Sequence, residues 1–148
     1  MSTTDPHSKT TSAALPVPAE FSEDMGIEYL GVVDGETTLR LELRQKHMSR
    51  ANRVHGGVLF TLLDSALGRS ILDALPEGRG CATVGIKVNY FRPVQSGCVT
   101  ARGRMRELTR SLGYAEGEVR NEEGKVLARA SGTFFLTQTL RQEDRERI

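Results

Sequence analysis

The sequence predicts an α+β domain in which a six-stranded antiparallel sheet wraps around one long central helix. Residues 56–75 are strongly apolar over about five turns at 3.6 residues per turn, which indicates a buried helix. Two segments with strand patterning precede this helix, and four follow it. A single sheet can cover a helix only if it curls, and the natural twist of strands supplies that curl.

The 148-residue chain is long enough for one domain with a core of its own. Residues 1–17 are rich in Ser, Thr and Pro and are expected to form a disordered tail, residues 18–137 the folded domain, and residues 138–148 a charged tail. A net charge of +1 gives no reason to expect a nucleic-acid or membrane partner. No secretion signal opens the chain and the two cysteines lack metal or redox spacing, so we expect a cytoplasmic protein with reduced thiols.

A short helix and a hairpin are expected before the central helix. Residues 18–24 suit a short helix, because proline fits a first turn and acidic residues favour a helix start. Residues 27–33 and 37–43 are typical strands, and the Asp-Gly pair between them is a strong turn signal. The polar residues 44–54 then form an irregular loop that leads into the helix.

Four strands are expected after the helix, which ends near Leu75 because Pro76 disfavours helical geometry in the preceding residue. Alternating apolar and polar residues predict these strands at 82–91, 98–108, 112–119 and 126–136. Short turns separate them, so we expect the four to pair in order as an antiparallel meander.

A narrow polar stripe runs along the apolar helix, at the three-and-four spacing that lines one face. The stripe consists of Gly57, Thr61, Asp64, Ser65 and Gly68. A carboxylate within an apolar helix costs several kcal/mol unless it is paired, hydrogen-bonded or used in chemistry. Asp64 is therefore either a structural partner of a neighbouring group or a functional acid.

The helix opens on a His-Gly-Gly turn that could bind an oxyanion. Gly56 and Gly57 lack a Cβ, so a ligand can approach their backbone closely. The first N–H groups of a helix have no partner within it and favour negative charge, as an acyl-transfer oxyanion requires. Gly56 and Asp64 lie roughly 12 Å apart along the helix axis at 1.5 Å per residue. If both act on one carbonyl, they should come from different subunits.

The sequence resembles hotdog-fold acyl-CoA thioesterases, in the subgroup named for phenylacetyl-CoA thioesterase. The resemblance runs from about Phe21 to Thr137 and is carried by residues 54–66 (VHGGVLFTLLDSA), 88–93 (VNYFRP) and 128–134 (ARASGTF). It implies the hotdog fold and hydrolysis of an aryl- or fatty-acyl-CoA. It also implies two subunits paired edge to edge with the acyl site at their interface. We expect a homodimer or a homotetramer made of two dimers.

The resemblance also implies catalytic roles for four residues. The Gly56 N–H would polarise the thioester carbonyl, and Asp64 would act as general base on water or, less readily, as nucleophile. His55 would either fix the turn through ring hydrogen bonds or contact the carbonyl. Thr83 matches a position near the attacking water, although a β-branched residue is also ordinary in a strand.

Five residues are candidates for substrate binding: Gly57, Asn52, Ser49, Thr61 and Arg92. In the family an Asn often lies six positions before the His, where this chain has Ser49, while Asn52 lies three before it. Both residues could simply be loop formers. Arg92, like Arg104, Arg106 and Arg110, could meet the phosphates of coenzyme A or belong to a solvated strand face.

Two other functions remain open from the sequence. The domain could bind acyl-CoA without turning it over, because a fold does not fix a function. It could also be a hotdog enoyl-CoA hydratase, which needs a His paired with an acid, whereas His55 and Asp64 lie nine residues apart in one helix region. No second His neighbours His55, so we expect no metal site, and the lack of a nucleophile elbow argues against a covalent Ser or Cys mechanism. The hydrolysis that the resemblance implies needs no cofactor.

Overall fold

The computed structural model describes residues 20–138, so the two predicted tails lie outside the described residues except for Gln138. The elements follow the predicted order closely. They are α1 (Glu20–Met25), β1 (Glu28–Val33), β2 (Glu36–Glu42), a 3-10 turn (Gln45–His47), α2 (Gly56–Ala74), β3 (Arg79–Tyr90), β4 (Cys98–Leu108), β5 (Leu112–Arg120) and β6 (Val126–Gln138).

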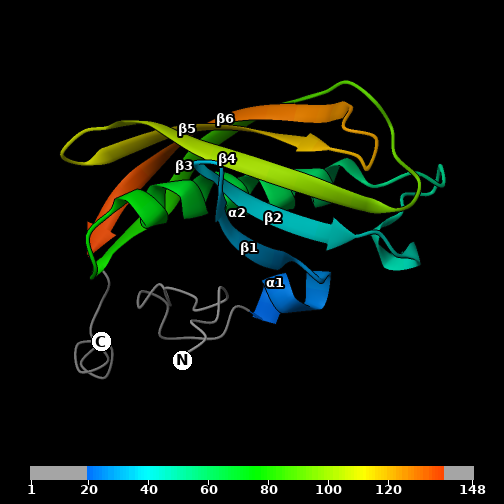
Figure 1. Ribbon diagram of the computed structural model, residues 1–148, viewed down its shortest axis with the longest axis horizontal. Helices are drawn as coiled ribbons and strands as arrows, with labels where there is room; N and C mark the ends of the chain where they lie inside the picture. The colour runs from blue at the N-terminus through cyan, green and yellow to red at the C-terminus, as the bar shows by residue number, and fades with distance from the viewer. Residues whose placement is uncertain (1–19, 139–148) are drawn as a thin grey trace, which may run out of the picture.

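The strands form one six-stranded sheet in the order β1-β2-β4-β5-β6-β3, and every neighbouring pair is antiparallel. The sheet arches over α2, which lies along its concave side (Figure 1). The predicted architecture of a six-stranded antiparallel sheet around one long helix is therefore confirmed.

The expected meander of the last four strands is wrong for β3. β4, β5 and β6 do pair in sequence order, but β3 pairs with β6, and β4 lies between β2 and β5. The reason is that α2 carries the chain along the concave side to the far edge of the sheet, where β3 begins. The connection at 91–97 then brings the chain back, and Val94 O on the way accepts a 2.8 Å hydrogen bond from Val54 N–H.

The core lies between α2 and the concave face of the sheet. Leucines from α2 pack there against inward-facing strand residues, and Phe134 of β6 is among the largest fully buried side chains.

Gly103 and Gly117 allow α2 to lie close to the sheet. A Cβ at Gly103 would collide with the backbone carbonyl of Ala66, and one at Gly117 would lie 2.7 Å from Leu67 Cδ1. Because side chains alternate along a strand, the residues beside these glycines project from the outer face.

Two parts of the helix–sheet unit remain open to solvent. Phe60 on α2 is 39% exposed, so the helix is not buried on every side. β3 forms one edge of the sheet, and Val84 at its centre is 63% exposed. Within residues 20–138, no helix is both long and apolar enough to cross a membrane.

Candidate active site

The turn before α2 is fixed by His55, which is the N-cap residue of that helix. Its backbone is extended (φ −62°, ψ 134°), and its Nδ1 accepts a 2.8 Å hydrogen bond from Gly57 N–H. The backbone oxygen of His55 accepts a second bond, of 2.9 Å, from Val58 N–H. Because Nδ1 is an acceptor, the neutral ring carries its proton on Nε2. The ring therefore caps the helix, and the Gly57 N–H is already used within the turn.

Gly56, the first residue of α2, is held by Tyr90 at the end of β3. The Tyr90 hydroxyl donates a 2.7 Å hydrogen bond to Gly56 O. The tyrosine ring also lies beside the glycine, since a Cβ at Gly56 would be 3.4 Å from ring atom Cζ. Among the described residues, no acceptor contacts the Gly56 N–H. This N–H is therefore free to meet an oxygen from outside the turn, as an oxyanion site requires.

Asp64 lies two turns further along α2 and faces β3. The Thr83 hydroxyl donates a 2.8 Å hydrogen bond to Asp64 Oδ1. A register shift in the β3–β6 pairing between Thr83 and Gly85 accompanies this arrangement, and Thr83 pairs with the buried Phe134 on the helix side of the sheet. The structure thus brings together two predicted catalytic residues from different elements.

Cys81 lies close to the same carboxylate. Burial, and then the negative charge of Asp64, raise the pKa of the Cys81 thiol to about 11. The thiol also donates a 3.6 Å hydrogen bond to Gly68 O on α2. A protonated, helix-facing thiol of this kind is a packing group rather than a nucleophile.

Gly56 and Asp64 belong to one continuous helix, which runs from Gly56 to Ala74. The rise of 1.5 Å per residue separates them by about 12 Å, as the sequence predicted. A single subunit therefore does not place both groups on the same carbonyl.

The predicted substrate-binding residues are only partly gathered around this region. Thr61 on α2 donates a 2.8 Å hydrogen bond to Gly57 O, next to the capped turn. Ser49 and Asn52 lie in a tight turn, in which both the backbone N–H and the hydroxyl of Ser49 bond to Arg53 O. Asn52 has a left-handed backbone (φ 54°), which Asn tolerates better than most residues. Both residues thus shape the loop.

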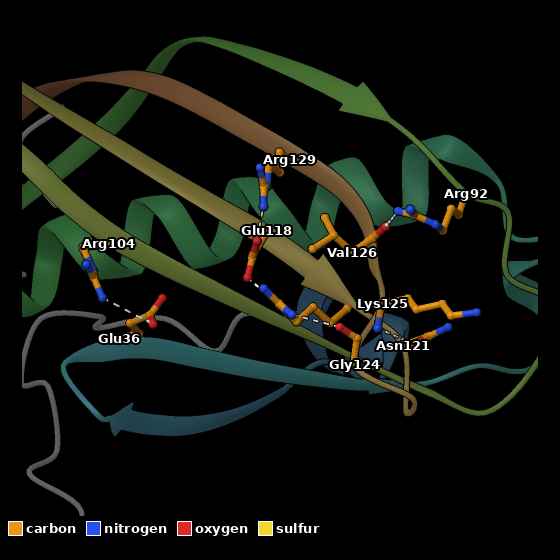
Figure 2. A network of polar contacts seen from close by, with 10 residues as sticks. Glu36, Arg92, Arg104, Glu118, Asn121, Gly124, Lys125, Val126 and Arg129 are labelled. Atoms are coloured by element: carbon orange, nitrogen blue, oxygen red, sulfur yellow. Dashed lines mark hydrogen bonds and ion pairs between the residues drawn. The ribbon is translucent and has the colours of Figure 1, made fainter.

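Arg92 follows β3 and donates a 2.7 Å hydrogen bond from Nη1 to Val126 O at the start of β6 (Figure 2). Arg104 and Arg106 lie on the outer face of the sheet, away from α2, and are ion-paired with Glu36 and Glu116. They line a hollow of about 550 Å³ on that face. These two arginines therefore lie on the opposite side of the sheet from Asp64.

His47 is a contributor that the sequence did not reveal. Its ring is buried, Nδ1 accepts a hydrogen bond from Arg44 N–H at 2.9 Å, and Nε2 donates to Met25 O at 2.8 Å. Its backbone oxygen accepts from His55 N–H at 2.9 Å. His47 thus connects the end of α1 to the His-Gly-Gly turn that precedes α2.

The chain is similar to proteins of one known family. The sequence model of the Thioesterase superfamily matches residues 51–128. A candidate esterase from Halobacterium salinarum is 32% identical over 97 residues. The match covers 62% of this chain and 64% of the Halobacterium protein, so this chain spans less than two thirds of the length of that relative. A mutant of the phenylacetic acid degradation protein PaaI from Thermus thermophilus has 32% identity and a TM-score of 0.70, over 78% of this chain and 97% of that one. A Bacillus halodurans protein, whose structure includes CoA, has 27% identity and a TM-score of 0.74, over 81% and 77%.

The fold and these similarities define a hotdog-fold thioester hydrolase. The chain belongs to the Thioesterase superfamily, and its structural neighbours include the PaaI-type proteins of phenylacetic acid degradation. The family, the fold and the enzyme class predicted from the sequence are thus confirmed.

Proposed function

We propose that the protein hydrolyses an aryl- or fatty-acyl-CoA to the free acid and CoA. The observation that carries this proposal is the hydrogen bond from Thr83 to Asp64, which orients a carboxylate on the helix whose first N–H remains free. The CoA in the Bacillus halodurans structure supports coenzyme A as the thiol part of the substrate. The PaaI neighbour supports an aryl acyl group.

In the proposed reaction, the Gly56 N–H of one subunit binds the thioester carbonyl oxygen. The partner subunit's Asp64 accepts a proton from water, and the water oxygen attacks the carbonyl carbon. The negative charge that develops on the carbonyl oxygen is stabilised by the Gly56 N–H and the positive end of the α2 dipole. The C–S bond then breaks, and the thiolate of CoA takes up the proton that Asp64 accepted from water, which leaves the free acid, CoA and the Asp64 carboxylate.

Thr83 and His55 support these two groups. Because Thr83 occupies Asp64 Oδ1, the other carboxylate oxygen is left for the water. His55 presents its Nε2–H beside the turn as a second donor for the carbonyl oxygen. Direct attack by Asp64, giving an anhydride that water then hydrolyses, is the less favoured variant because the carboxylate is already oriented as a base.

We propose that two subunits join through the edge of β3 that pairs with no other strand in the part of the chain that the structure describes. An open edge strand with an exposed Val84 is an aggregation hazard unless it is covered. A two-fold axis at this edge would pair two β3 strands and bring Gly56 of each chain towards the partner's Asp64, giving two equal sites. The same dimer could associate further into a tetramer made of two dimers.

We propose that the acyl-CoA lies over the start of α2. Gly57 and Thr61 border that surface, Asn52 and Ser49 form the turn that precedes it, and Arg92 keeps guanidinium N–H groups beyond its bond to Val126 O. One such group would contact a CoA phosphate, which suits the geometry of Arg.

A thiol-release assay over a series of aryl- and fatty-acyl-CoAs tests the reaction. We expect release of free CoA from the native protein, and a loss of about 10²–10⁴ in kcat for Asp64→Asn and Asp64→Ala, the range for removal of a general base. Asp73→Asn is the matched control. Asp73 lies on the same helix but bonds to Tyr29, Thr37 and Arg69, so this variant should keep its activity.

The same assay separates the alternatives. Saturable binding of acyl-CoA with no release of CoA would replace hydrolysis by a carrier or sensor function. Formation or hydration of an enoyl product would favour a hydratase. Normal activity in Asp64→Ala would remove Asp64 from its proposed role.

A further inference from the structure

Tyr90 joins the end of β3 to the first peptide of α2. Its hydroxyl lies 2.7 Å from Gly56 O, although the two residues are 34 positions apart in the sequence. Its ring packs beside the same glycine. A helix carbonyl has a second lone pair, so it can accept this hydroxyl without losing its bond within the helix.

The peptide unit that Tyr90 contacts also reaches His55. Gly56 O and Gly57 N–H belong to one planar peptide, and that N–H donates to His55 Nδ1 at 2.8 Å. Hydroxyl, peptide and imidazole therefore form one chain of hydrogen bonds, in which each bond polarises the next. The chain runs in one direction and ends on the His55 ring, whose remaining proton is on Nε2.

The hydrogen-bond chain matters because the peptide that it holds lies between two glycines. Glycine has the widest conformational freedom of any residue, and Gly56 and Gly57 are adjacent at a helix end, where few bonds restrain the backbone. Tyr90 and His55 hold the peptide between them from its two sides. The neighbouring Gly56 N–H is thereby kept in one direction.

We propose that Tyr90 is a positioning residue, which acts through the Gly56–Gly57 peptide to hold the His55 ring with Nε2–H outward and the Gly56 N–H in place. The kinetic part of this proposal rests on the proposed thioesterase function, whereas the hydrogen-bond chain does not. Burial raises the pKa of Tyr90, so the hydroxyl keeps its proton and remains a donor throughout the neutral range.

Tyr90→Phe tests the proposal, because phenylalanine keeps the ring beside Gly56 and removes only the hydroxyl. Tyr114→Phe is the matched control, since the Tyr114 hydroxyl contacts Glu116 on the outer face of the sheet. The first readout is NMR with ¹⁵N-labelled glycine and histidine. We expect the Gly57 amide proton to move upfield and exchange faster, and the His55 ring to populate both tautomers, in Tyr90→Phe alone.

The second readout is kinetic. We expect kcat in Tyr90→Phe to fall about tenfold with KM little changed, which is less than the 10²–10³ loss for removal of an oxyanion donor itself. A purely structural role would lower the thermal midpoint and leave both the His55 tautomer and the kcat of the folded fraction unchanged.

The NMR readout tests the positioning role of Tyr90, and the activity assay tests the proposed thioesterase function, so either can be overturned without the other. Unchanged Gly57 and His55 signals in folded Tyr90→Phe would overturn the positioning role, whether or not the protein is a thioesterase. The expected NMR changes in a protein that hydrolyses no acyl-CoA would overturn the proposed function and leave the hydrogen-bond chain standing.

If Tyr90→Phe does not fold, 3-fluorotyrosine at position 90 keeps the hydroxyl and lowers its pKa. The Gly57 and His55 signals should then change as the pH rises through titration of that phenol. Signals that stay constant through this titration would overturn the proposal.

Discussion

Thr83 and Asp64 are joined by a 2.8 Å hydrogen bond that crosses from β3 to α2. The bond fixes Asp64 Oδ1, whereas Asp64 Oδ2 has no hydrogen-bond partner within residues 20–138. It also couples the edge strand of the sheet to the helix that begins with Gly56. The position of the proposed base therefore depends on β3 as well as on α2.

Replacing Thr83 by Val removes the hydroxyl and keeps the shape of the side chain. We expect kcat to fall about tenfold, below the 10²–10⁴ contributed by a general base, because Asp64 loses its orientation and not its charge. The free energy of unfolding should fall by only about 1 kcal/mol, the usual net value of a hydrogen bond. Steady-state thioester hydrolysis and urea unfolding measure the two effects.

Thr83→Ser should restore most of the activity, and Thr133→Val is the control for loss of a threonine hydroxyl from the neighbouring strand. Equal kcat values for Thr83→Val and the native protein would show that the hydrogen bond plays no part in the chemistry.

Gly56→Pro deletes the proposed oxyanion donor with little other change. Gly56 is the first residue of α2, where proline is favoured and its missing N–H breaks no helical bond. His55 already has the extended backbone that a following proline requires. We expect a loss of about 10²–10³ in kcat, the range for removal of one oxyanion donor, with the helix retained by circular dichroism.

Gly56→Ala is the matched control because it keeps the N–H. Its Cβ would lie 3.4 Å from the Tyr90 ring, which is an ordinary contact. Similar losses in the alanine and proline variants would mean that space beside Tyr90 matters and the N–H does not.

Mixing two inactive variants tests whether the site is shared between subunits. Asp64→Ala and Gly56→Pro subunits, unfolded together and refolded, should form heterodimers with one intact site and one doubly damaged site. We expect activity to return to about one quarter of the native value, because half of the dimers formed at random carry one of two sites. Subunit exchange verified by mass spectrometry, with no activity recovered, would exclude a shared site.

The Cys81 thiol reports on the charge of Asp64. In a Cys98→Ser background, alkylation of Cys81 by iodoacetamide should rise with a midpoint near pH 11, because burial and the Asp64 carboxylate both disfavour the thiolate. Asp64→Asn removes the negative charge, so the midpoint should move to lower pH. Burial is the larger cause, so the pKa should still exceed that of a free thiol. An unchanged midpoint would mean that the Asp64 carboxylate lies too far from Cys81 to influence its thiol.

Much of the fold could be predicted because its elements are local in origin. The apolar run, the His-Gly-Gly turn and Pro76 predict α2 within one residue of its observed bounds, Gly56–Ala74. The place of β3 could not be predicted in this way. Alternation indicates that a strand exists but does not name its partner, and the short connection after β3 suggested pairing with β4. The path of α2 across the sheet determines which edge β3 reaches, and that path depends on tertiary packing, which local sequence patterns do not show.

In the candidate site, too, the residues with a local sequence signal could be predicted, and those whose roles depend on tertiary contacts could not. Asp64 could be singled out because a carboxylate in an apolar helix requires a reason, and Gly56 because helix starts leave N–H groups free. Tyr90 and His47 were missed, since an aromatic residue in a strand and a histidine in a loop are common. Their roles come from contacts with Gly56 O and Met25 O, which are 34 and 22 positions away.

The pairing of β3 with β6 also bears on the order in which the protein can fold during synthesis. Arg79, at the start of β3, pairs with Gln138, the last described residue. While the ribosome is still adding β4 and β5, β3 has no neighbour in the sheet, and α2 has only part of its apolar surface covered. Such a chain exposes both an apolar helix and an unpaired strand, the surfaces that chaperones bind. The six-stranded sheet therefore cannot be completed until β6 has emerged from the ribosome.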